Sequence, residues 1–191
     1  MSNKKGMLVL YTGSSGVGKG TLMERLLEAD KSIRLSVSNT TREPRKGEID
    51  GVHYNFVTKD EFLSLIDKEG YLEYAEYCGN YYGTPKQQVE NLLDEGYNVF
   101  LEIEVQGGLQ VMEKYPDILS IFILPPSMES LERRLRRRGT EDEETIQKRL
   151  KAAEEEMHYK SKYKYNVING DLDVAVNEIL DILHKEVEKN N

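Results

Sequence analysis

The chain has 191 residues, 38% hydrophobic and 31% charged, a composition typical of one globular domain with or without small inserted subdomains. Its 26 basic and 34 acidic residues give a net charge of −8, which argues against non-specific binding to nucleic acid or to an anionic membrane. Cys78 is the sole cysteine, so internal disulfides and multi-cysteine metal sites are excluded and a reducing compartment is expected.

Apolar segments alternate with helical patterns, and this alternation predicts a parallel sheet flanked by helices. We expect buried strands at residues 7–11, 97–105, 118–124 and 167–168. Helices are expected after the glycine-rich turn that follows the first strand, and from residue 172 towards the end of the chain. The first apolar run is shorter than a signal-peptide core of about 7–15 residues, and no apolar run approaches the roughly 18 residues of a membrane span. We therefore expect a cytoplasmic chain.

Residues 38–83 interrupt this alternation and predict a small inserted α+β region. A strand is expected at 54–57, followed by a helix that begins at a capping box at 58–61. Gly70 is expected to form the glycine cap at the end of that helix. Two further strands are expected on either side of a turn at 78–80.

A second interruption, residues 132–157, is helical throughout and highly charged. A break at Gly139 and a new cap starting at Thr140 predict a helix–turn–helix hairpin with little core of its own, a candidate mobile lid. Thr84 is expected to cap another helix, with Pro85 in its first turn. The predicted division is a core of 1–37, 84–131 and 158–191, an insertion of 38–83 and a lid of 132–157.

The most informative segment lies between the first predicted strand and the first predicted helix. It matches the phosphate-loop pattern G-x-x-x-x-G-K in the strand–loop–helix context that this pattern requires. Its glycines let successive main-chain N–H groups face phosphate oxygens, and Lys19 can neutralise charge on a transferred phosphoryl group. The alternative is a glycine-rich turn with one surface lysine. The segment consists of Gly13, Ser14, Ser15, Gly16, Val17, Gly18, Lys19, Gly20 and Thr21.

Gly20 follows the lysine, where many phosphate loops carry the Ser or Thr that binds Mg²⁺ directly. We therefore expect Mg²⁺ to be held mainly by phosphate oxygens and water, with Thr21 and Glu102 as candidate direct ligands. Glu102 and Glu104 are expected on one face of the strand at 97–105, near the carboxyl end, where ligands dock in parallel sheets. The run Gly-Lys-Gly-Thr resembles the loop of nucleoside monophosphate kinases.

The inserted region contains groups suited to a second, phosphorylated ligand. Arg42 and Arg45 lie three residues apart, and arginine binds phosphate through paired hydrogen bonds. Tyr54 and Tyr82 add phenol hydroxyls. Strand alternation directs Glu73 to one face, where a carboxylate can accept hydrogen bonds from guanine N1–H and N2–H₂ but leaves adenine unpaired. Taken alone, these residues are equally consistent with an ordinary loop and a small exposed sheet.

Several motifs together resemble the guanylate kinase family from about residue 5 to residue 183. They include Gly-Ser-Ser-Gly-Val-Gly-Lys-Gly-Thr at 13–21, Ser-Asn-Thr-Thr-Arg-Glu-Pro-Arg at 38–45, Gly-Val-His-Tyr-Asn-Phe at 51–56, Gly-Asn-Tyr-Tyr-Gly at 79–83, Glu-Ile-Glu-Val-Gln-Gly at 102–107 and Arg-Arg-Arg-Gly-Thr at 136–140. The resemblance implies an α/β fold with a phosphate-loop parallel sheet, a GMP-binding insertion and a helical lid. It implies phosphoryl transfer from ATP to GMP, and also to dGMP, in purine nucleotide metabolism, with Mg²⁺ as the cofactor and ADP and GDP as the products.

The resemblance also implies roles for individual residues. Those that match holders of the GMP phosphate are Arg42, Arg45, Tyr54 and Tyr82. Those that match guanine contacts are Ser38, Glu73 and Thr84, with Glu104 as an acidic residue near the acceptor. On the ATP side it implies binding by the loop at 13–21, contacts to the phosphates from Arg134, Arg138 and Arg149, and a contact near adenine from Asn169. The implied catalytic groups are Lys19, Arg42 and the three lid arginines.

Two alternatives to this kinase stay open. Scaffold domains of the same fold bind phosphopeptides without catalysis, but they typically have a degraded phosphate loop, whereas this loop is intact. A phosphate-loop kinase acting on a ribose phosphate is the second alternative, and Ser38, Glu73 and Thr84 argue against it because they suit a base. We expect no nucleic-acid or membrane partner, and the sequence is compatible with a monomer and with a homo-oligomer.

Overall fold

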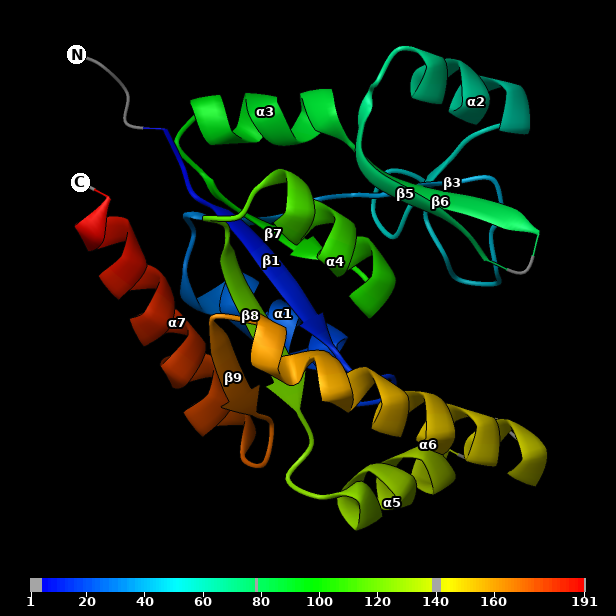
Figure 1. Cartoon of the computed structure of the whole chain (residues 1–191), viewed down its shortest axis with the longest axis vertical. Helices are drawn as coiled ribbons and strands as arrows, with labels where there is room; N and C mark the ends of the chain where they lie inside the picture. The colour runs from blue at the N-terminus through cyan, green and yellow to red at the C-terminus, as the bar shows by residue number, and fades with distance from the viewer. Residues whose placement is uncertain (1–4, 78, 139–141, 191) are drawn as a thin grey trace.

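The computed structural model describes residues 5–77, 79–138 and 142–190. Its main sheet has five parallel strands in the order β2-β7-β1-β8-β9 (Figure 1). The strands are β1 (Leu8–Gly13), β2 (Ile33–Leu35), β7 (Asn98–Glu102), β8 (Leu119–Leu124) and β9 (Tyr165–Ile168). The strands predicted from apolar runs correspond to β1, β7, β8 and β9, and the α/β fold class is confirmed. The edge strand β2 is only three residues long, too short to show a periodic pattern.

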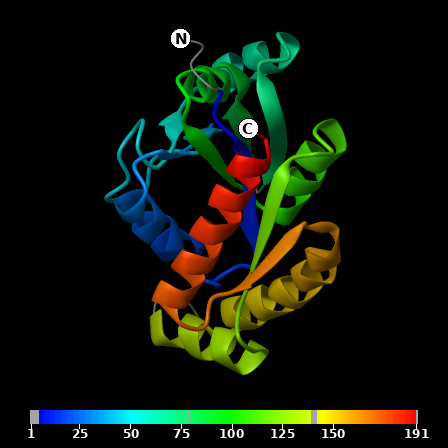
Figure 2. The same cartoon turned by 90° about the vertical axis from the view of Figure 1, so that its left-hand side faces the viewer.

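Helices cover both faces of this sheet. They are α1 (Lys19–Ala29), α3 (Lys86–Asp94), α4 (Val105–Lys114) and α7 (Leu172–Lys189). On β1, Val9 and Tyr11 point to the face where α1 and α7 lie side by side (Figure 2). Leu10 points to the opposite face, towards α3 and α4. All three side chains are completely buried, as expected for a parallel sheet covered on both faces.

A smaller sheet has the strand order β4-β3-β6-β5. Its strands are β3 (Asn39–Thr40), β4 (Asn55–Phe56), β5 (Tyr71–Tyr77) and β6 (Asn80–Pro85). Helix α2 (Lys59–Asp67) packs on it through Phe62, whose ring stacks on Tyr71 and Tyr81 at centroid distances of 4.4 and 5.4 Å. The predicted capping box is confirmed, because Thr58 and Glu61 each accept a hydrogen bond from the other's main-chain N–H. Cys78, in the predicted turn, lies outside the described residues.

Two helices, α5 (Met128–Arg138) and α6 (Glu143–Met157), form a hairpin at one end of the molecule (Figure 1). A small apolar cluster holds them together, separate from the clusters of the main sheet; it contains Leu131, Leu135, Ile146 and Ala153. Helix α5 begins before the predicted start at residue 132, because the Ser127 hydroxyl accepts a hydrogen bond from the Ser130 N–H at 3.1 Å. A short 3₁₀ helix, η1 (His158–Lys162), connects α6 to β9.

The start of α6 differs from the prediction in the residue that caps it. Asp142 is the N-cap, and its carboxylate accepts a hydrogen bond from the Thr145 N–H at 2.8 Å. Thr140 and Glu141, where the cap was expected, lie outside the described residues, as does Gly139. Among the described helices, none combines the length and the apolar composition of a membrane span.

The strand predicted at 97–105 is wrong at its end, residues 103–105. Strand β7 ends at Glu102, and Glu104 is the N-cap of α4, which begins at Val105. Glu102 and Glu104 therefore do not share one strand face. The apolar run continues past the strand because the first turns of α4 are themselves buried against the sheet, at Val105 and Gly108 among others. Periodicity alone cannot separate a buried strand from the start of a buried helix.

The predicted glycine cap at Gly70 is also wrong in its detail. The residue with left-handed backbone at the end of α2 is Glu69, with φ of 52°. Gly70 follows it and donates its N–H to the Leu65 carbonyl at 2.9 Å. A Cβ at Gly70 would lie 2.3 Å from a Leu65 side-chain carbon, so glycine is required there for close packing rather than for its dihedral angle.

Candidate active site

The predicted phosphate loop connects β1 to α1 at the carboxyl end of the sheet's central strand. Gly16 and Gly18 have φ of 81° and 95°, left-handed conformations that glycine adopts without a steric penalty. A Cβ at Gly13 would lie 2.6 Å from the Ile123 carbonyl oxygen, so glycine lets β1 pass this close to β8. Backbone shape therefore favours glycine at Gly16 and Gly18, and the neighbouring strand β8 requires it at Gly13.

A cavity of about 400 Å³ opens at this loop. It is lined by Ser15, Gly16, Val17, Gly18, Lys19, Gly20, Thr21, Glu24, Glu102, Glu104 and Arg149. The Lys19 ammonium donates a hydrogen bond to the Gly13 carbonyl at 2.7 Å. Predicted residues from the loop, from the end of β7 and from α6 therefore meet in one cavity. Glu24, on α1, is a lining residue that the sequence analysis missed.

Carboxylates surround the lysine in this cavity. Burial raises the pKa of Glu102, while Lys19 lowers it and Glu104 raises it further. Glu156, on α6, accepts a hydrogen bond from the Ser15 N–H at 3.0 Å, and burial raises its pKa as well. A main-chain N–H of the loop therefore binds a carboxylate oxygen. The sequence analysis missed Glu156, which lies 141 positions from Ser15 and belongs to no motif.

Two arginines of the helical hairpin reach the phosphate loop in different ways. Arg149 donates two hydrogen bonds to the Ser15 hydroxyl, at 3.1 and 3.2 Å, and lines the cavity. Arg134 donates to the main-chain carbonyls of Val17 and Asn169, at 3.0 and 2.7 Å. The Asn169 side-chain amide donates to the same Val17 carbonyl at 2.8 Å. Arg134 and Asn169 thus brace the loop through its main chain.

On the smaller sheet, Arg42, Tyr54 and Tyr82 come together. The two tyrosine rings meet edge to face at 5.9 Å, and the Arg42 guanidinium carbon lies 5.6 Å from the Tyr54 ring centroid. The Glu48 carboxylate, and more weakly the Tyr82 hydroxyl, raise the pKa of Arg42. Glu48, which the sequence analysis missed, forms a paired ion contact with Arg42.

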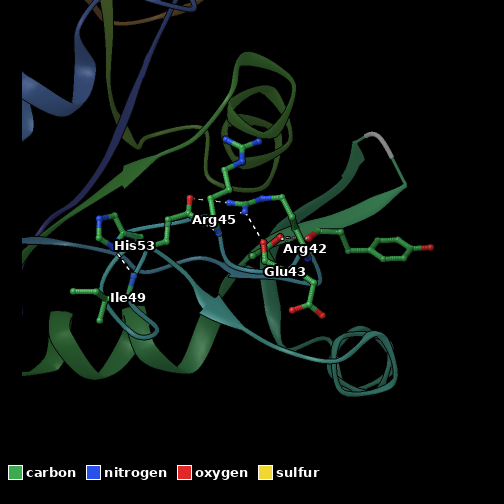
Figure 3. A network of polar contacts seen from close by, with 8 residues as sticks. Arg42, Glu43, Arg45, Ile49 and His53 are labelled. Carbon is green, nitrogen blue, oxygen red and sulfur yellow. Dashed lines mark hydrogen bonds and ion pairs between the residues drawn. The ribbon is translucent and has the colours of Figure 1, made fainter. Parts of the chain in front are cut away.

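The other predicted acceptor residues of this loop are held through their main chains. The Arg45 N–H donates to the Glu48 carboxylate at 2.7 Å, while its exposed side chain extends from the same loop as Arg42 (Figure 3). The Ser38 carbonyl accepts a hydrogen bond from the Asn55 N–H at 2.9 Å. The side chain of Arg138, at the end of α5, lies outside the part of the chain that the structure describes.

Glu73 is buried, with 5% of its surface exposed, and accepts a hydrogen bond from the Thr84 hydroxyl at 2.7 Å. The prediction that Thr84 caps a helix is wrong, because Thr84 lies within β6 and Pro85 is the N-cap of α3. Burial raises the pKa of Glu73. A Cβ at Gly107 would lie 2.8 Å from Glu73 Oε2, so this carboxylate faces the first turn of α4, which Glu104 caps.

The two groups of residues lie close enough to influence each other. The pKa of Tyr54 is raised first by burial and by Tyr82, and also by Glu102 and Glu104 in the cavity of the phosphate loop. Glu102 and Glu104 thus line the cavity of the phosphate loop and also lie near enough to Tyr54, next to the smaller sheet, to raise its pKa. The arrangement can hold two phosphorylated ligands, one on main-chain N–H groups and one on arginine and tyrosine side chains.

Comparison with known proteins agrees with this geometry. The sequence model of the guanylate kinase family, described as "Guanylate kinase", matches residues 5–186. The chain belongs to the guanylate kinase family. Relatives named guanylate kinase include that of Clostridium perfringens (strain SM101 / Type A), 52% identical over 96% of this chain and 85% of the relative. That of Caldanaerobacter subterraneus subsp. tengcongensis is 51% identical over 96% of this chain and 89% of the relative.

A solved structure of the same family shares the fold. The crystal structure of guanylate kinase from Anaplasma phagocytophilum is 37% identical to this chain and superposes with a TM-score of 0.77. The superposition covers 97% of this chain and 88% of that one. Guanylate kinase membership thus extends over both sheets and the helical hairpin, rather than over the phosphate loop alone.

Proposed function

We propose that this chain transfers the γ-phosphoryl group of ATP to GMP, giving ADP and GDP. The proposal rests on family membership and on one observation: Glu102 and Glu104 line the cavity of the phosphate loop and also raise the pKa of Tyr54 in the arginine–tyrosine cluster, so the two groups of residues are neighbours. A phosphoryl acceptor and a donor bound at these two places would meet end to end. We extend the proposal to dGMP as a second acceptor, because its base and phosphate present the same groups as those of GMP. We also propose that the protein acts in the cytoplasm.

On the donor side, the loop N–H groups and Lys19 hold the ATP phosphates. The Ser15 N–H binds a carboxylate oxygen of Glu156, which supports an anion-binding role for this N–H. Lys19 reaches the same cavity with its ammonium group, and Arg149 adds a second positive charge from α6. These charges act on the oxygens of the transferred group, where charge neutralisation contributes most to phosphoryl transfer.

On the acceptor side, Arg42, Arg45, Tyr54 and Tyr82 hold the GMP phosphate. One oxygen of this phosphate attacks the γ-phosphorus of ATP as the bond to the bridging oxygen breaks and ADP leaves. The protein supplies position rather than covalent chemistry, because the two nucleotides need only be held in line with water excluded. The helical hairpin is the proposed lid, the region 38–83 is the proposed GMP-binding insertion, and Arg138 is a further proposed lid contact.

The acceptor base is selected by Glu73. Its carboxylate keeps one oxygen on the Thr84 hydroxyl and directs the other towards α4. A carboxylate so placed accepts from guanine N1–H and N2–H₂, whereas adenine presents an acceptor at N1 and would leave Glu73 unpaired in a buried site. Further proposed contacts to guanine come from Ser38 and Thr84, and Glu104 is the proposed acidic residue near the acceptor nucleotide. On the donor side, Asn169 is proposed to lie near the adenine of ATP.

The oxygen groups at the donor cavity suit Mg²⁺. Thr21 and Glu102 line the same cavity as Lys19, and hard oxygen donors are what this ion prefers. In the described ranges, no group of three or more His, Cys, Asp or Glu side chains is placed to hold a metal ion, so phosphates and water are the proposed main ligands. Bound there, Mg²⁺ would supply charge neutralisation on the phosphate oxygens.

A coupled assay for ADP tests the proposal with ATP and four acceptor conditions: GMP, dGMP, AMP and none. We expect turnover with GMP and dGMP, much less with AMP, and little ATP hydrolysis without an acceptor. Turnover with a ribose phosphate but not with GMP would overturn the choice of acceptor. Absence of turnover with every acceptor, together with phosphopeptide binding, would favour a non-catalytic scaffold domain.

A further inference from the structure

Glu48 links Arg42 and Arg45, the two proposed phosphate-binding arginines, whose loop Figure 3 shows. Its carboxylate accepts from both terminal nitrogens of Arg42, Nη1 at 3.0 Å and Nη2 at 2.9 Å, and from the Arg45 main-chain N–H at 2.7 Å. The Glu48 N–H in turn donates to the Arg45 carbonyl at 3.0 Å. The side chains of Arg42 and Glu48 are only 14% and 18% exposed, so this contact is largely shielded from water.

These contacts determine how the Arg42 guanidinium is turned. Its Nη1 is fully engaged, because it also donates to the Glu43 carbonyl at 2.7 Å. Its Nε is buried and has no partner within the described residues. A guanidinium has five N–H donors, so Nη2 keeps one hydrogen that Glu48 does not use. The Tyr82 hydroxyl lies beside this guanidinium, and a phosphate held by Tyr82 could take that hydrogen.

We propose that Glu48 is a positioning residue for the acceptor phosphate: it holds the Arg42 guanidinium and the Arg45 main chain so that both arginines meet one phosphate. The inference rests on the proposed function, because it concerns the acceptor site of the same reaction. Arginine side chains have many rotamers, and freezing them on binding weakens affinity. A carboxylate that orients them beforehand strengthens phosphate binding without contacting the nucleotide.

The opposite interpretation makes a different prediction. If the Glu48 carboxylate merely occupied the place of the phosphate, GMP would have to displace it, and neutralising Glu48 would tighten GMP binding. If Glu48 positions Arg42, neutralising it weakens GMP binding. The direction of the change in GMP affinity on neutralising Glu48 therefore distinguishes the positioning role from competition with the phosphate.

The experiment compares two ligands on Glu48→Gln by calorimetry: GMP, and guanosine, which lacks the phosphate. The amide keeps the size of the side chain but loses the charge and the paired contact. We expect GMP to bind about 10-fold more weakly, the loss associated with a hydrogen bond to a charged group, and guanosine to change less than about 2-fold. The KM for ATP is expected to stay unchanged, because the donor cavity does not include Glu48.

A double-mutant cycle tests whether Glu48 acts through Arg42. On an Arg42→Ala background, adding Glu48→Gln is expected to weaken GMP binding less than about 2-fold further. Glu43→Gln is the matched control, because it removes the same charge from the same loop. The Glu43 side chain is exposed, only its carbonyl contacts Arg42, and the substitution keeps that carbonyl.

Three results would overturn the proposal: tighter or unchanged GMP binding by Glu48→Gln, an equal loss for guanosine and GMP, or full additivity with Arg42→Ala. Should Glu48→Gln fail to fold, Glu48→Asp replaces it, with an expected loss of about 3-fold that is again confined to GMP. If the wild-type chain neither bound nor phosphorylated GMP, the proposed function itself would be refuted. Failure of the Glu48 proposal can therefore be distinguished from failure of the proposed function.

Discussion

The phosphate loop and the cluster around Arg42 are both proposed to bind phosphate, but they are built from different parts of the chain. The loop offers main-chain N–H groups held between β1 and α1, with Val17 anchored in the core cluster of the main sheet. The cluster offers long side chains from separate segments of a small sheet. A main-chain site depends on backbone shape, and therefore on glycines and on what packs behind them. A side-chain site depends on further residues that hold each side chain in place.

The two regions also treat carboxylates differently. Around the loop, burial dominates and raises the pKa of Glu102 and Glu156. Near Arg42, the hydrogen bonds from Arg42 and from the Arg45 N–H lower the pKa of Glu48 to about 2. Acidic residues at the donor cavity are thus held at an electrostatic cost, whereas Glu48 is stabilised by its partners.

The largest effect is expected from Lys19, the proposed charge of the loop on the transferred phosphoryl group. Lys19→Ala should lower kcat about 10³-fold, since a preorganised positive charge at the transferred group is lost. The coupled assay measures this directly. Lys31→Ala is the control, because Lys31 likewise donates to a main-chain carbonyl, that of Leu27 at 3.1 Å, but at the exposed end of α1. Near-wild-type kcat in Lys19→Ala would show that the loop does not hold the donor.

In the side-chain site, Glu73→Gln tests base selection. The amide presents a donor where guanine also donates, so kcat/KM for GMP should fall about 10²-fold while that for AMP changes little. The ratio of the two kcat/KM values is the measurement. Glu76→Gln, an exposed position on the same strand, should leave the ratio unchanged. An unaltered GMP/AMP preference in Glu73→Gln would refute the role of this carboxylate.

A glycine substitution in the phosphate loop tests whether this main-chain site depends on backbone shape and on the residues packed behind it. Gly16→Ala places a Cβ 2.7 Å from a Leu135 side-chain carbon, at a residue whose φ is 81°. The substitution should therefore lower the free energy of unfolding by about 1–3 kcal/mol and raise the KM for ATP. Gly51→Ala is the control, because Gly51 has a similar φ of 75° but a Cβ added there would have no neighbour within 4 Å. This variant therefore has the backbone strain without the steric contact. Denaturant unfolding of both variants measures the difference. Equal losses would mean that packing against α5 does not shape the loop.

The smallest effect is a dependence of stability on pH. Glu48 has a pKa of about 2 in the folded chain against an ordinary value of 4.5, so the unfolded chain binds more protons between these values. The stability that Glu48 contributes is therefore present above pH 4.5 and is lost as pH falls towards 2. The stability difference between wild type and Glu48→Gln should shrink over this range, as followed by denaturant unfolding. A difference independent of pH would mean that the ion pair contributes nothing.

Local signals in the sequence were sufficient where neighbours along the chain make the contacts. The capping box of α2 links Thr58 to Glu61, and the phosphate loop depends on glycines within one turn of chain. The buried strands and the last helix follow from periodic burial. Local signals failed at Thr84, which lies in β6 and bonds Glu73 across the β5–β6 hairpin instead of capping α3, and at Glu104, which caps a buried helix that the apolar pattern did not separate from the strand before it.

From the amino-acid order alone came the α/β class, the phosphate loop, the family and most of the residues proposed to bind nucleotides. Only folding in three dimensions revealed the carboxylates that contact those residues: Glu156 on the loop N–H and Glu48 on Arg42. The physical reason is that such pairs follow from how separate segments pack, and neither periodicity nor spacing records which side chains will meet. The hydrogen bond from Arg134 to the loop carbonyl of Val17 is likewise a contact between separate segments that only the folded structure reveals, while its contact with the ATP phosphates stays a prediction.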